Sequence, residues 1–129
     1  MKKIIDCFVN FLSEKLPDSN VRVSYASAKK SYPQITVDCV QKNSAVAKSR
    51  CSNFALEILI ETQAFKDKDK INIDSLFDQI GKIFYTPNLE HELSTEEVEI
   101  LFINCSSTTF DCFDNIFTYM LDIEVWANV

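Results

Sequence analysis

Residues 53–61 read NFALEILIE, and this stretch indicates the fold class more clearly than any other. Large apolar residues occupy every second position from Phe54 to Ile60, and only Leu59 breaks the alternation. An alternation of period two puts successive side chains on opposite faces of a β-strand. The stretch therefore predicts a sheet strand that turns one face toward a hydrophobic core.

The same alternation appears in four other segments, which extend the predicted sheet. They are residues 21–26, 34–39, 98–104 and 114–126. The first two are separated by a short polar and basic segment, which predicts a β-hairpin. Together with residues 53–61, these segments predict a mainly antiparallel sheet of about five strands.

Two segments have helical rather than alternating periodicity. Apolar side chains recur at helical spacing in residues 3–16, which Pro17 ends, and again in residues 73–85. Residues 66–70 are a charged connector, and residues 88–97 form an acidic loop in this interpretation. Two helices packed on one face of the sheet would bury both apolar surfaces. We therefore expect a single α+β domain that takes in the whole chain of 129 residues.

The composition offers little with which to build a reaction centre. Gly81 is the only glycine, which excludes the usual glycine-rich phosphate loops. His91, the only histidine, lies in the acidic segment, and the five cysteines have no CxxC spacing. Paired carboxylates are expected by chance among 19 acidic residues. We predict no catalytic residues, no metal and no cofactor, and we expect most cysteines to be small, reduced core residues.

The charge narrows the choice of partners. A net charge of −6 argues against a surface that grips nucleic acid, although a polyanion could slide past such a surface without adhering. No apolar stretch approaches the length of roughly 20 residues that a membrane-spanning helix needs. The N-terminus leads into an amphipathic segment instead of a signal peptide, so we expect a cytosolic setting and no membrane contact.

Charge is unevenly distributed along the chain, with basic residues gathered in 29–50 and acidic residues in 88–99. Two poles of opposite sign suit head-to-tail association, although ordinary scatter of surface charge explains them too. We expect an exposed loop at residues 41–51. Trp126 is expected on the outward face of the last strand, where it is either an interface residue or packed under a loop. The candidate interface residues are Lys42, Lys48, Arg50, Asp122, Glu124 and Trp126.

The order of the predicted elements is itself informative. A short helix (4–16) and a strand (21–25) precede a strand that begins near a proline (32–37). A long loop, the strand 54–61, the helix 73–84 and the strand 117–125 follow. In order and spacing, over nearly the whole chain, this layout resembles the tail terminator (tail completion) proteins of long-tailed bacteriophages and their relatives at the head–tail joint.

The resemblance implies a homo-oligomeric ring, usually a hexamer, that caps the tail tube and docks to the head connector. DNA would pass through an acidic channel without specific binding, and no reaction or cofactor would be involved. The protein would belong to the tail or neck of the virion and would be assembled in the host cytoplasm. Residues 41–51 would contact the tube or a neighbouring subunit.

Two other classes of protein remain open on the residues alone. One is a small acidic cytosolic adaptor, such as a secretion-chaperone-like domain, which would bind a segment of another protein, usually as a dimer. The other, more weakly supported, is an enzyme with a cysteine nucleophile.

Overall fold

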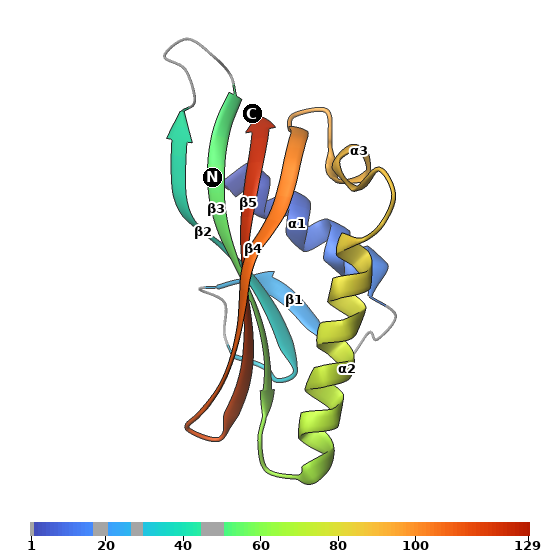
Figure 1. Ribbon diagram of the computed structural model, residues 1–129, viewed down its shortest axis with the longest axis vertical. Helices are drawn as coiled ribbons and strands as arrows, with labels where there is room; N and C mark the ends of the chain where they lie inside the picture. The colour runs from blue at the N-terminus through green and yellow to red at the C-terminus, as the bar shows by residue number, and fades with distance from the viewer. Residues whose placement is uncertain (1, 17–20, 27–29, 45–50) are drawn as a thin grey trace.

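The computed structural model describes residues 2–16, 21–26, 30–44 and 51–129. Three helices and five strands make up this part of the chain. They are α1 (Lys2–Lys15), β1 (Arg22–Tyr25), β2 (Gln34–Ser44), β3 (Cys51–Gln63), α2 (Asp67–Phe84), α3 (Leu89–Leu93), β4 (Glu99–Phe113) and β5 (Ile116–Asn128). The strands form one sheet in the order β1-β2-β3-β5-β4, and the helices lie on one side of it (Figure 1). The predicted α+β class is confirmed.

The predicted hairpin between the first two strands is wrong. β1 and β2 are parallel, with Arg22 opposite Gln34, whereas every other neighbouring pair is antiparallel. The described residues just before β2 contact the side of the sheet that the helices leave uncovered. There Lys30 Nζ lies 3.7 Å from Glu61 Oε1, and the Ser31 backbone N–H donates a 3.0 Å hydrogen bond to Gln34 Oε1. Lys30 and Ser31 are thereby tied to the sheet, and alternation within each strand does not tell a parallel pair of strands from a hairpin.

The charged connector at residues 66–70 is the first turn of α2, so this expectation also needs correction. The Asp69 carboxylate accepts hydrogen bonds from the backbone N–H groups of Phe65 (3.0 Å) and Lys66 (2.8 Å). Acidic residues in the first turn, here Asp67 and Asp69, also stabilise a helix by interacting favourably with its dipole. The helix therefore begins at Asp67, about two turns before its apolar periodicity becomes visible.

The acidic segment 88–97 contains α3 and is not simply a loop. Its five residues bury Leu89 and Leu93, while Glu90 and Glu92 remain closer to the solvent. The two leucines, four residues apart, lie on one face of the short helix and attach it to the core. A third helix therefore joins the two that the sequence predicts.

The strands are longer than their apolar alternation indicates. Residues 41–44 and Cys51 belong to strands β2 and β3, so the expected loop 41–51 is shorter. β4 runs through the polar stretch at 106–109 because it is held by its pairing with β5 and not by burial. Asp114 and Asn115, both with positive φ, make the two-residue turn between β4 and β5.

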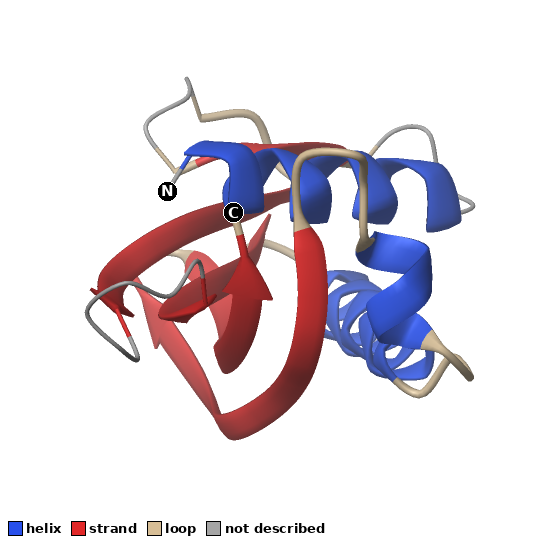
Figure 2. Ribbon diagram, turned by 90° about the horizontal axis from the view of Figure 1, so that it is seen from above, coloured by secondary structure: helices blue, strands red, loops and turns tan. Residues whose placement is uncertain are grey.

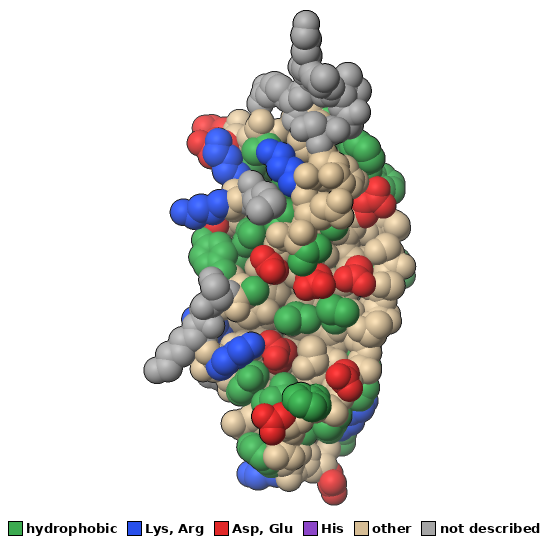
Figure 3. Space-filling view, turned by 90° about the vertical axis from the view of Figure 1, so that its left-hand side faces the viewer, with side chains coloured by type: hydrophobic (Ala, Val, Ile, Leu, Met, Phe, Trp, Pro, Cys, Tyr) green, Lys and Arg blue, Asp and Glu red, His purple; other side chains and the backbone are tan. Residues whose placement is uncertain are grey.

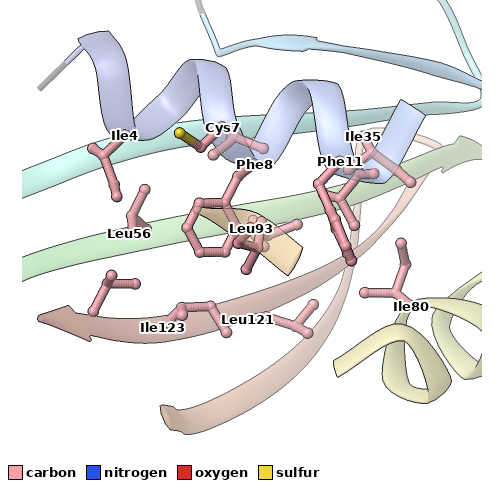
Figure 4. Packing of buried hydrophobic residues seen from close by; sticks show 14 of the residues in the cluster. Ile4, Cys7, Phe8, Phe11, Ile35, Leu56, Ile80, Leu93, Leu121 and Ile123 are labelled. Atoms are coloured by element: carbon pink, nitrogen blue, oxygen red, sulfur yellow. The ribbon is translucent and has the colours of Figure 1, made fainter. Parts of the chain in front are cut away.

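The core lies between the helices and one face of the sheet (Figure 2). Phe8 and Phe11 point from α1 toward the strands, where Leu56 and Ile123 lie on β3 and β5 (Figure 4). Phe8 is 1% exposed, and its ring lies 6.5 Å from that of Phe84 on α2. One continuous cluster therefore joins the helices to the sheet and leaves the opposite sheet face for other contacts.

Candidate assembly surface

Three carboxylates lie side by side on the sheet face opposite the helices. Asp38 on β2 is directly opposite Glu57 on β3, which is directly opposite Asp122 on β5. Figure 3 looks onto this face and shows acidic side chains crossing its middle. Side chains at such positions have Cβ atoms about 5 Å apart, and like charges there are destabilising. We call these three residues the carboxylate row; it concentrates negative charge in the middle of this face.

The candidate residues Glu124 and Trp126 lie on the same face, next to the carboxylate row. Glu124 Oε1 accepts a 3.1 Å hydrogen bond from Asn53 Nδ2 and a 2.9 Å bond from Trp126 Nε1. Asp122 accepts a 2.6 Å hydrogen bond from the Ser107 hydroxyl. Trp126 is half-buried, and its indole N–H is already hydrogen-bonded to Glu124. A partner could therefore cover the exposed part of its ring without leaving the N–H unpaired.

The candidate Lys42 is on the other face. The register of β2 shifts between Cys39 and Gln41, which places Lys42 opposite the core residue Phe54. Its Nζ lies 5.7 Å from the centre of the Phe54 ring. The structure therefore does not bring Lys42 together with Asp122 and its neighbours. Lys48 and Arg50, the other two basic candidates, lie outside the described residues.

Apart from the outer edge of the four-residue β1, two stretches of strand edge have no partner strand within the part of the chain that the structure describes. β4 is the outermost strand and pairs only with β5 along its 15 residues. The second edge is the upper part of β2, because β1 pairs with it only from Gln34 to Val37. Proteins commonly protect such edges with lysine, proline or bulges. Residues 101–110 of β4 contain two register shifts but no charged residue and no proline.

The two edges differ in charge. Lys82 is the last basic residue, so the nine acidic residues of 83–129 have no lysine or arginine among them, and residues 1–82 contain 13 basic and 10 acidic residues. β4 and β5 belong to the acidic part, whereas the free edge of β2 contains Lys42. Charge counts alone could have shown this division, but the opposite edges of the sheet become apparent only from the strand order.

A groove of about 810 Å³ runs between α2, α3 and β4. Its apolar lining includes Phe77, Phe84 and Ile103, and Gly81 lies on its helical wall. The groove borders the free edge of β4, so it extends the candidate assembly surface onto the helix-covered side of the sheet.

The described residues give little support to catalysis by cysteine. The expectation that most cysteines are core residues is wrong, because only Cys7 and Cys39 are buried and Cys105 and Cys112 are exposed. Burial raises the pKa of the Cys7 and Cys39 thiols, and desolvation by neighbouring atoms followed by the Asp122 charge raises the pKa of Cys105. A raised pKa keeps a thiol protonated and weakens it as a nucleophile. His91 lies exposed on α3.

The described ranges hold neither a cluster of metal ligands nor a membrane-spanning helix. No group of three or more histidine, cysteine or acidic side chains there is placed to hold a metal ion. None of the helices in these ranges combines the length and apolar character needed to cross a membrane.

The comparisons with known proteins do not place the chain in a family. No model of a known protein family matches it, and no curated protein is significantly similar in sequence.

Proposed function

We propose that the chain is a structural subunit of a ring that terminates the tail of a long-tailed bacteriophage. The ring would cap the tail tube and join it to the head connector. The observation that carries the proposal is a pair of free edges on one sheet: β4, whose only charged residues are Glu99 and Asp111, and the upper part of β2, whose residues 40–43 hold Lys42 as their only charge. Two different, complementary surfaces on one chain allow head-to-tail contacts, and such contacts form a ring when the rotation closes.

Two further features support this proposal. The resemblance to tail terminator proteins rests on the order of the elements. The structure has this order, a helix, three strands, a helix and two strands, with α3 added before β4. The carboxylate row lies on the open sheet face, and a face of that kind turned to a channel would let DNA pass without adhering. The partners would be the tail tube protein and the connector of the same virion, and no reaction is involved.

The test is the mass of the assembled protein. Light scattering after size-exclusion chromatography should give a mass of several chains of 14.8 kDa each, with six as the expected number. Electron microscopy should show rings and, with tail tubes of the phage that encodes the chain, rings at the tube end. A chain that stays monomeric at high concentration and in the presence of those tubes would exclude the proposal.

A second candidate function is an adaptor domain that binds an extended segment of another protein. The groove beside the free edge of β4 favours it, because a segment could pair with the strand and place apolar side chains in the groove. Such a domain would form a dimer or remain a monomer and would not form a ring. The same mass measurement therefore separates the two functions.

A further inference from the structure

Gly81 lies in the last turn of α2, within the helix, where glycine is less favourable than alanine because it loses more backbone freedom on folding. Its backbone does not require glycine, since its φ is not positive. Leaving aside its chain neighbours and the nearby helix backbone, a Cβ atom added at Gly81 would meet no atom of the described residues within 4 Å. Neither the conformation of the helix nor its packing within the chain therefore explains the only glycine of the sequence. A close approach from outside the chain does explain it.

The space in front of Gly81 is the groove. The groove is lined by side chains of α2, such as Phe77, and of β4, such as Ile103 and Cys105. A strand added to the edge of β4 would continue the sheet along this groove, and a missing side chain on α2 would leave room for it.

We propose that this groove and the free edge of β4 receive the upper edge of β2, residues 40–43, from a second copy of the chain. The sheet of one subunit would then continue into the sheet of the next. This inference rests on the proposed function, because it names the contact between neighbouring subunits of the ring.

Charge and exposure favour this edge of a second copy as the occupant. Val40 is apolar and 53% exposed, and it lies next to the exposed Lys42. The charged residues that line the groove are two acids, Asp78 and Glu90, and one base, Lys82. After Lys82 the sequence contains acidic residues but no lysine or arginine. Two β4 edges would instead bring together strands whose charged residues are all acidic, which like-charge repulsion disfavours. The contact is therefore head-to-tail.

Two variants, one for each surface, test the proposal. Gly81→Trp places a large side chain in the groove, and its Cβ meets no described atom within 4 Å. Val40→Asp/Lys42→Glu reverses the charge of the β2 edge. Ile71→Trp is the matched control, because Ile71 lies on the same helix, is 70% exposed and does not line the groove. Circular dichroism should show wild-type helix and strand content for all three proteins.

We expect each groove or edge variant alone to be a monomer and the control to assemble like the wild type. An equimolar mixture of the two variants should form a dimer, because the first keeps an intact β2 edge and the second an intact groove. A mixture that stays monomeric, or a Gly81→Trp protein that assembles normally, would overturn this interface and leave the ring itself standing. A monomeric wild-type chain would overturn both proposals.

A measurement on the unmodified chain gives an independent check. Cys105 lines the groove, whereas Cys112 is exposed near the β4–β5 turn and outside the groove. Labelling with a thiol reagent, followed residue by residue with mass spectrometry, should be at least about tenfold slower at Cys105 in the assembly than in the Gly81→Trp monomer. Cys112 should react equally in both. Equal labelling of Cys105 in assembly and monomer would exclude the groove as the contact.

Discussion

Replacing Glu57 with glutamine should stabilise the fold. Glu57 is the middle member of the carboxylate row and has a like charge directly opposite on each side, Asp38 on β2 and Asp122 on β5. Neither Glu57 nor Asp38 forms an ion pair with another described residue. Glutamine keeps the length of the side chain and removes both repulsions at once.

The spacing of the strands sets the magnitude. Two unit charges about 5 Å apart repel by about 0.8 kcal/mol in water, and a Debye length of about 8 Å at physiological salt roughly halves this value. Two such pairs give about 0.8 kcal/mol for Glu57→Gln. An unfolding entropy of about 2.1 cal/mol/K per residue over this chain turns that into a rise of about 3 °C in melting temperature. At about 1 M salt the Debye length is about 3 Å, and the rise should fall to about 1 °C.

Thermal unfolding at both salt concentrations, followed by circular dichroism, measures this effect. All proteins are compared at the same protein concentration, because assembly also shifts the melting temperature. Glu96→Gln is the control, since Glu96 is exposed and lies outside the strands, so its melting temperature should change little. Asp122→Asn should gain less than Glu57→Gln, because Asp122 has one like-charged neighbour and accepts the bond from Ser107. A Glu57→Gln protein that melts no higher than the wild type at low salt, or whose gain is the same at both salts, would refute the repulsion.

Three other substitutions test the packing and the helix α2. Phe8→Ala should lower the free energy of unfolding by about 3–5 kcal/mol, measured by denaturant unfolding, because it empties a fully buried site. Gly81→Ala should raise that free energy by about 0.5–1 kcal/mol in the monomer, and a decrease would show that the helix needs glycine. The pKa of Asp74 is lowered first by the hydrogen bond from Lys70 and then by the one from Tyr119. The stability that Asp74 contributes is therefore fully present above the unfolded pKa of about 3.9, and it is lost as the pH falls through the lower folded pKa. Asp74→Asn should therefore flatten the fall in melting temperature below about pH 4, and an unchanged acid profile would contradict this assignment.

The periodic signals in the sequence predict the parts of the fold that are held by burial. The alternation of Phe54 to Ile60 correctly places β3, and helical spacing locates the core-facing parts of α1 and α2. Elements held by other forces are missed or shortened. The first turn of α2 depends on the capping carboxylate of Asp69, and the outer half of β4 depends on pairing with β5, so neither has an apolar pattern to detect.

The candidate surface depends on register, which explains why the sequence predicts it only in part. A shift of one residue reverses the face of every later side chain in a strand, and the irregularity after Cys39 moves Lys42 to the core side in this way. The same register puts Asp38 opposite Glu57, although their separation in the sequence gives no sign of it. Charge counts predict two poles, but only the strand order places them at opposite edges of one sheet. A chain with complementary edges could bind a copy of itself at each edge, and the proposal of a ring rests on this property more than on any single residue.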